Sequence, residues 1–214
     1  MNTKKKYIPA LSFSGLTPLY DLLMRLGMRE DAFKRRLVEQ AEIQPGQRVL
    51  DMGCGTGTLT IMLKQLHPEA EVVGLDGDLK ILAIARAKAA KAGVEISLEH
   101  GMADRLPYPD GSFDRVLTSL MIHHLSTEDK RAAIAGVNRV LRPGGEFHIA
   151  DFGPPRGAYA RLAATLMRRL EHAAENLAGL LPGMLIEAGF EDVEQTAHYT
   201  TVFGTLVLMR GRKA

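Results

Sequence analysis

Between residues 47 and 151 the chain alternates short apolar runs with longer segments of helical periodicity, and this alternation restricts its possible folds more than any other feature. The runs have the length of strands, whereas the intervening segments carry apolar residues three or four positions apart. The predicted strands are 47–51, 71–76, 94–99, 113–119 and 146–151, and the predicted helices are 59–66, 79–92 and 126–141. Strands joined by helices in this order form a parallel sheet with helices on both faces, connected by right-handed crossovers.

The two ends of the chain are expected to extend and cover this sheet. Residues 19–40 have helical periodicity and are predicted to form one or two helices ahead of the first strand. Further helices are predicted over 158–176 and 180–188. Two β-rich runs, 190–197 and 199–209, have almost nothing between them, so they are predicted to pair as an antiparallel hairpin. The fold class is therefore α/β, with a mostly parallel seven-stranded sheet that has an antiparallel C-terminal strand.

The composition fits one globular domain and excludes several classes of protein. The chain has 214 residues, of which 46% are hydrophobic and 24% charged, which is usual for a soluble domain. Its single cysteine, Cys54, excludes a disulfide framework and a cysteine-based zinc site. The net charge of +2 is too small to indicate a nucleic-acid partner, and no apolar run approaches the roughly 18 residues of a membrane span. The start of the chain lacks the apolar segment of a secretory signal, so we expect a cytoplasmic protein without a membrane span.

The segment from Val49 to Gly57 carries the clearest signal for a binding site. It runs from a predicted strand through Gly53, Gly55 and Gly57 into a predicted helix. Alternate glycines let a ligand approach the backbone, and the helix that follows offers free N–H groups at its positive end. Dinucleotide-binding enzymes have the pattern G-x-G-x-x-G, whereas Thr58 stands at the position of the third glycine here. The loop therefore favours a nucleotide-like or carboxylate-bearing ligand over a dinucleotide.

A carboxylate stands at the end of the second predicted strand. Asp76 is expected to face the glycine loop across the carboxyl edge of the sheet. An ionised carboxylate only accepts hydrogen bonds, so Asp76 can bind both hydroxyls of a ribose. Asp78 is the better candidate for the N-cap of the next helix.

Four motifs in order make the chain similar to a known family. They are Val49–Gly57, Asp76, Leu106–Asp114 and Leu141–Gly145. The chain resembles the class I S-adenosylmethionine-dependent methyltransferases, in particular the bacterial methyltransferase type 11 subgroup that includes the ubiquinone/menaquinone C-methyltransferases. The resemblance covers roughly residue 20 to the C-terminus. It implies a Rossmann-like doubly wound fold, S-adenosylmethionine as cofactor, and in-line transfer of a methyl group to a small-molecule acceptor.

The resemblance also implies which residues bind the cofactor. Asp51 would help fix the ammonium group and Asp76 would bind the ribose. Many relatives have Gly-Asp-Ala after the third strand, whereas this chain has Gly-Met-Ala-Asp at 101–104, so Asp104 either replaces the displaced acid or is an exposed loop residue. Met102 would pack on the adenine, and the Ala103 backbone would contact the ring edge. The full set implied is Asp51, Gly53, Cys54, Gly55, Thr56, Asp76, Gly77, Met102, Ala103 and Ser119.

Two adjacent histidines follow the fourth predicted strand, where cofactor and acceptor are expected to meet. With an ordinary pKa near 6.5, His123 or His124 could act as a general base, and the alternative is that one of them packs or caps the next helix. Adjacent side chains rarely converge on one ion, so we predict no metal site. Asp151, at the end of the fifth strand, is predicted to line the substrate side, with a cap or loop role as the alternative. The resemblance makes Tyr20 a second substrate-pocket residue.

These expectations divide the single domain into four parts. They are an N-terminal helical cap (1–45), a cofactor-binding core (46–151), substrate-covering helices (152–189) and a C-terminal β-hairpin (190–214). The alternative functions are a methyltransferase that acts on RNA or protein and a non-catalytic S-adenosylmethionine-binding protein. The sequence identifies neither the acceptor atom nor the oligomeric state.

Overall fold

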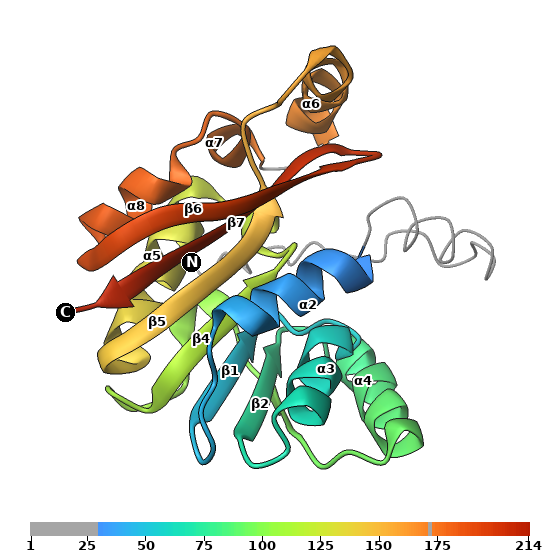
Figure 1. Cartoon of the computed structure of the whole chain (residues 1–214), viewed down its shortest axis with the longest axis vertical. Coiled ribbons are helices and arrows are strands. Elements are labelled where there is room, and N and C mark those ends of the chain that lie inside the picture. The colour runs from blue at the N-terminus through green and yellow to red at the C-terminus, as the bar shows by residue number, and fades with distance from the viewer. Residues whose placement is uncertain (1–29, 171–172) are drawn as a thin grey trace, which may run out of the picture.

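The computed structural model describes residues 30–170 and 173–214, and Figure 1 shows how their strands and helices are arranged. The predicted helical residues before position 30 lie outside the described residues. The strands are β1 (Arg48–Met52), β2 (Glu71–Asp76), β3 (Ser97–His100), β4 (Phe113–Ser119), β5 (Leu141–Phe152), β6 (Phe190–Thr201) and β7 (Gly204–Lys213). The helices are α2 (Glu30–Gln40), α3 (Thr58–Leu66), α4 (Leu79–Ala92), α5 (Thr127–Val140), α6 (Ala158–Leu170), α7 (Ala174–Leu177) and α8 (Leu181–Glu187), with short 3-10 helices η1 (Ala103–Arg105) and η2 (Ile122–His124).

A single sheet of seven strands organises the described residues, in the order β3-β2-β1-β4-β5-β7-β6. β1 to β5 pair in parallel, while β7 runs antiparallel to both of its neighbours, β5 and β6. This topology confirms the predicted mostly parallel sheet with an antiparallel C-terminal strand. The strand order reverses at β1, so the carboxyl ends of β1 and β4 meet at the point where doubly wound sheets bind their ligands.

Helices cover both faces of the sheet because successive residues of each strand point to opposite sides. Val49 and Leu117 pack in the same cluster as the buried side chains of α2, α3 and α6. Leu50 and Val116, their neighbours in sequence, pack with α5 and α8 on the other face. Figure 1 shows α2 and α3 in front of the sheet and α5 and α8 behind it.

Local signals place most helix ends correctly. Asp78 is the N-cap of α4, where its carboxylate accepts hydrogen bonds from the backbone N–H groups of Lys80 and Ile81. Ser126, one of the two predicted candidates, is the N-cap of α5. The predicted helix over 158–176 is instead divided into α6 and α7. In the described part of the chain, no helix combines the length and the apolar character needed to cross a bilayer.

Candidate cofactor and acceptor site

A cavity of about 500 Å³ opens at the carboxyl ends of β1, β2 and β4. Its lining comes from α2, the glycine loop, the end of β2, the segment after β3, and the segment between β4 and α5. Most of the residues predicted to bind the cofactor lie here together: Gly53, Cys54, Gly55, Thr56, Asp76, Gly77, Met102, Ala103 and Ser119. The sheet topology therefore brings together segments that are far apart in sequence.

The glycine loop leaves its backbone open to the cavity. Gly53 and Gly55 have φ angles of +74° and +54°, in the left-handed region that favours glycine. A Cβ at Gly53 would lie 2.3 Å from Cγ of Met121, so a larger residue does not fit there. A Cβ at Gly55 would meet no atom within 4 Å and would project into open space. The N–H groups of Gly53 and Cys54 donate to the carbonyl of Leu75, at 2.8 and 2.9 Å, and so hold the loop against the end of β2.

Asp76 links this loop to the start of α4. Its Oδ2 accepts a hydrogen bond of 2.9 Å from the N–H of Gly55, and its Oδ1 accepts one of 2.9 Å from the N–H of Asp78. Asp76 also lines the cavity. A carboxylate offers about four lone pairs, so each oxygen can accept a further hydrogen bond from a ligand hydroxyl.

Asp51 lies beneath the loop and does not line the cavity. The side chain is 1% exposed, and its Oδ2 accepts a hydrogen bond of 2.6 Å from the hydroxyl of Thr60. Burial raises the pKa of the Asp51 carboxyl to about 6, against the opposing effects of Thr60 and of the positive charge on Lys34. Asp51 is therefore absent from the cavity lining, and its role in fixing a ligand ammonium stays a prediction.

The segment after β3 supplies the side of the cavity predicted to hold an adenine. Met102 is 39% exposed, and the Asp104 side chain, which also lines the cavity, is only 11% exposed. Of the two alternatives for Asp104, the structure is consistent with a cavity residue and not with an exposed loop residue. Ser119 lies opposite, at the end of β4.

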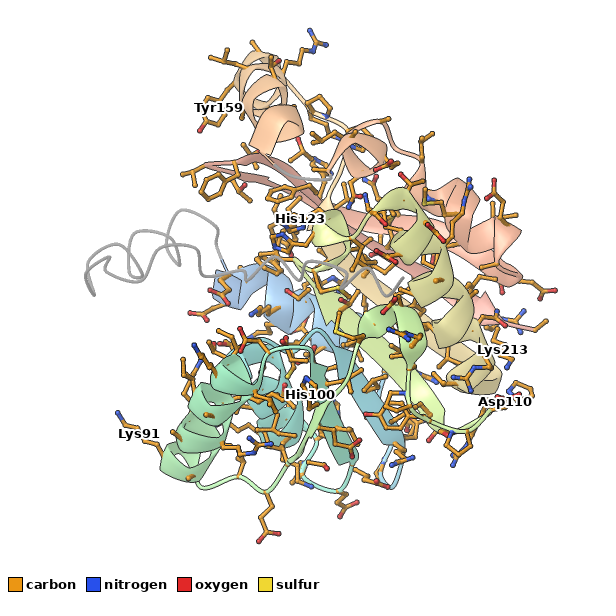
Figure 2. The ribbon with its side chains drawn as sticks, turned by 180° about the vertical axis from the view of Figure 1, so that it is seen from behind. Lys91, His100, Asp110, His123, Tyr159 and Lys213 are labelled. Atoms are coloured by element: carbon orange, nitrogen blue, oxygen red, sulfur yellow. The ribbon has the colours of Figure 1, made fainter. Side chains whose placement is uncertain are left out.

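The two adjacent histidines have different environments. His124 lines the cavity, whereas His123 is 4% exposed and lies behind it, near the centre of the molecule (Figure 2). The Nδ1 atom of His123 is 2.8 Å from Oδ1 of Asp151, and its backbone N–H donates to Oδ2 of the same carboxylate at 3.2 Å. Burial disfavours the charged form of Asp151, but His123 and the backbone N–H groups hold the pKa of this carboxyl below its usual value. The rings of the two histidines have centroids 4.0 Å apart.

Of the two predicted acceptor-pocket residues, the structure describes only Asp151. Asp151 does not line the cavity, because it is fully buried and its carboxylate is engaged by His123. Tyr20 lies outside the described residues. Within the described ranges, no group of three or more histidine, cysteine, aspartate or glutamate side chains is arranged to hold a metal ion.

Comparison with known proteins agrees with this geometry. A methyltransferase-domain family model matches residues 49–145. A demethylmenaquinone methyltransferase from Thermus thermophilus is 38% identical over 174 residues, which cover 80% of this chain and 77% of that protein. The chain belongs to the class I S-adenosylmethionine-dependent methyltransferases. A ubiquinone/menaquinone biosynthesis C-methyltransferase from Shewanella putrefaciens is a second relative, 29% identical, with coverage of 98% of this chain and 92% of the relative.

Solved structures of methyltransferases share the fold. The apo form of the S-adenosylmethionine-dependent methyltransferase SibL has a TM-score of 0.72 and 24% identity, covering 94% of this chain and 60% of that one. The magnesium protoporphyrin IX methyltransferase from Synechocystis has a TM-score of 0.70 and 21% identity, covering 94% and 90%. These likenesses show the Rossmann-like arrangement of the methyltransferase.

The cavity of the methyltransferase fits the cofactor of its family. The Oγ atom of Ser119 is buried without a hydrogen-bond partner in the described part of the chain, and Ser119 lines the cavity. A buried hydroxyl without a partner costs free energy, so a polar group of a ligand at this position satisfies it. The open backbone at Gly55 and the remaining lone pairs of Asp76 provide further polar contacts for a nucleoside.

Sequence reasoning missed the contribution of α2 to this methyltransferase site. Glu30 and Lys34 line the cavity, and the Lys34 ammonium is 2.6 Å from Oε1 of Glu30. Lys34 is only 9% exposed. The spacing of Glu30 and Lys34 predicts an intrahelical ion pair, but only the packing of α2 over the sheet brings this pair to the glycine loop.

Replacing Asp51 with asparagine is expected to stabilise the free protein at pH 8. Because burial raises the pKa of Asp51 from 3.8 to about 6, the stability contributed by this group falls as the pH rises through that range. Asparagine keeps an acceptor for the Thr60 hydroxyl without a charge to bury, so the free energy of unfolding should rise by roughly 1–3 kcal/mol at pH 8. Urea denaturation at pH 8 and at pH 4 measures the effect, which should be much smaller at pH 4. A Thr60→Val control removes the hydrogen-bond donor and should destabilise the protein at pH 8, and equal destabilisation by Asp51→Asn at both pH values would contradict the prediction.

Proposed function

We propose that this methyltransferase transfers the methyl group of S-adenosylmethionine to a ring carbon of a small quinone-type acceptor in its reduced, hydroquinone form. The observation that carries the proposal is that His124 lines the same cavity as the glycine loop and Asp76. The names of the similar demethylmenaquinone and ubiquinone/menaquinone methyltransferases support this class of acceptor. The net charge of +2 also suits a small molecule better than a nucleic acid.

Residues from separate elements bind different parts of the cofactor in this proposal. Asp76 accepts hydrogen bonds from the ribose hydroxyls, while the segment 101–104 contacts the adenine, with the Asp104 carboxylate near its amino group. The Lys34 ammonium faces the carboxylate of the methionine part. Asp51 supports the loop from beneath and acts on the ammonium group only through its charge.

His124 is the general base in the proposed reaction. S-adenosylmethionine supplies an electrophilic methyl group, so the chain has to align the acceptor and manage its protons. A hydroquinone hydroxyl makes its ring carbon most nucleophilic when it has lost its proton, and His124 accepts that proton. As the new carbon–carbon bond forms, the bond between the methyl group and sulfur breaks, and its electron pair leaves with S-adenosylhomocysteine. The ring carbon then releases its own hydrogen as a proton to solvent, which restores the aromatic ring, and the ring oxygen takes its proton back from His124.

His123 and Asp151 are positioning residues for this base. The Asp151 carboxylate fixes the ring of His123 through Nδ1, and that ring lies against His124. The ring of Phe152 packs edge-on against His123 with centroids 4.8 Å apart. A buried ring fixed by these contacts restricts the orientation of His124 toward the cavity.

The proposal predicts methylation of a reduced quinone and not of its oxidised form. The protein is incubated with S-adenosylmethionine and a demethylated 1,4-naphthoquinone that bears a short prenyl chain, with or without chemical reduction, and products are identified by mass spectrometry. A product heavier by one CH₂ group is expected only from the reduced compound. Methylation of neither form would contradict the proposed acceptor. Titration with S-adenosylhomocysteine by calorimetry tests the cofactor site separately, because that binding does not depend on the acceptor.

A further inference from the structure

Helix α6 and the turn between β6 and β7 expose a group of apolar side chains. Leu162 is 74% exposed, Tyr159 is 56% exposed and Val202 is 46% exposed. The Tyr159 hydroxyl donates a hydrogen bond of 2.6 Å to the carbonyl of Val202, so the helix and the turn form one fixed surface. We call Tyr159, Leu162 and Val202 the α6 patch. Figure 1 shows that α6 projects at one end of the molecule, and Figure 2 labels Tyr159 there.

The opposite side of α6 holds the helix on the sheet. Ala160 and Ala164 are 1% and 4% exposed, and the carbonyl of Ala160 lies close to Gly204 at the start of β7. These small side chains allow close packing, which fixes the direction in which the patch points. None of the three patch residues lines the cofactor cavity. The exposed apolar side chains of α6 therefore contribute neither to the hydrophobic core nor to the cofactor cavity.

The sequence segment that contains α6 carries charge of one sign. Residues 152–170 include four arginines and neither aspartate nor glutamate. Arg156, just before α6, and Arg161, in its first turns, are exposed. Exposed leucine and tyrosine side chains with arginines beside them are typical of helical segments that lie in the interface of a bilayer. Anionic lipid headgroups complement this charge.

We propose that the α6 patch docks the protein on the surface of an anionic lipid bilayer. Leu162, Tyr159 and Val202 insert at the boundary between headgroups and acyl chains, while Arg156 and Arg161 contact lipid phosphates. Three projecting apolar side chains with arginines beside them suit a deformable lipid surface better than the matching concave surface that a protein partner would need. This proposal does not depend on the identity of the methyl acceptor.

Co-sedimentation of the full chain with vesicles tests the proposal. The protein should bind vesicles that contain phosphatidylglycerol and should bind pure phosphatidylcholine vesicles much more weakly. Leu162→Glu should lower the partition coefficient at least ten-fold. The double variant Arg156→Glu/Arg161→Glu should lower the partition coefficient by a similar factor, but only on the anionic vesicles. Each basic residue near the surface contributes about a five-fold effect.

A matched control makes the same chemical change elsewhere. Ile186 is 62% exposed on α8, and Ile186→Glu should leave vesicle binding unchanged. All variants should keep the thermal unfolding temperature and the affinity for S-adenosylhomocysteine of the unsubstituted protein, because the changed side chains are exposed and lie outside the cavity. Three results would overturn the proposal. The protein could fail to bind anionic vesicles, Leu162→Glu and Ile186→Glu could lose vesicle binding equally, or the protein could self-associate through Leu162 without binding vesicles at all.

Discussion

Replacing Asp76 with alanine is expected to weaken the binding of S-adenosylhomocysteine at least 100-fold. The proposed contact is a pair of hydrogen bonds from ribose hydroxyls to a charged carboxylate, and two such bonds together contribute about 3 kcal/mol or more. The substitution also removes the hydrogen bond from the N–H of Gly55, which holds the glycine loop at the edge of the cavity. Calorimetric titration of the purified variant measures the loss directly, without an assay of methyl transfer.

Asp78→Ala is the matched control for this measurement. Asp78 lies two residues away and is the N-cap of α4, but it does not line the cavity. Losing the cap should reduce the free energy of unfolding by about 1 kcal/mol and leave the affinity within a few-fold of the original value. If Asp76→Ala bound S-adenosylhomocysteine as tightly as the unsubstituted protein, the ribose site would lie elsewhere.

Replacing His124 with alanine is expected to reduce the turnover number about 100-fold or more while changing the affinity for S-adenosylhomocysteine less than three-fold. General base catalysis contributes roughly this factor, and the nucleoside contacts come from other parts of the cavity. The measurement is the rate of methyl transfer to the reduced quinone acceptor at saturating concentrations of both substrates. Added imidazole should restore part of the activity, because it replaces the missing base in the space that the substitution leaves.

His123→Ala separates the base from the residue that positions it. This change leaves the buried carboxylate of Asp151 without the ring that hydrogen-bonds to it, so the free energy of unfolding should fall by about 3 kcal/mol. Turnover should fall less than in His124→Ala, and imidazole should not restore it. Full activity of His124→Ala, or rescue of both variants by imidazole, would contradict the assignment of the base.

The fold could be predicted from the sequence because its signals are local. Apolar runs, helical periodicity and residues such as Asp78 act within a few positions, so strand order along the chain and most helix ends follow from them. Differences arise where tertiary contacts decide a boundary. β5 begins at Leu141, before the predicted start, because Leu141 pairs with Phe113 ahead of a register shift, and the helix predicted over 158–176 is divided in two.

The site could be predicted where its residues follow strands directly. A parallel sheet brings the carboxyl ends of its strands to one edge, so Asp76 and the glycine loop had to lie together. The same rule does not predict how deeply a side chain at that edge is buried. Asp51 and Asp151 end strands at that edge, yet both are buried, because Thr60 and His123 respectively engage their carboxylates on the inner side.

The sequence by itself determined the sheet, the glycine loop and the acid at the end of β2, since each depends on residue type and on spacing along the chain. Only the tertiary structure decided which of two adjacent histidines reaches the cavity, because that depends on the turn of η2 and on the hydrogen bond between His123 and Asp151. It also decided that Lys34 belongs to the site and that the apolar side of α6 faces outward. These features depend on how helices pack over the sheet, and helix packing joins residues that no local pattern connects.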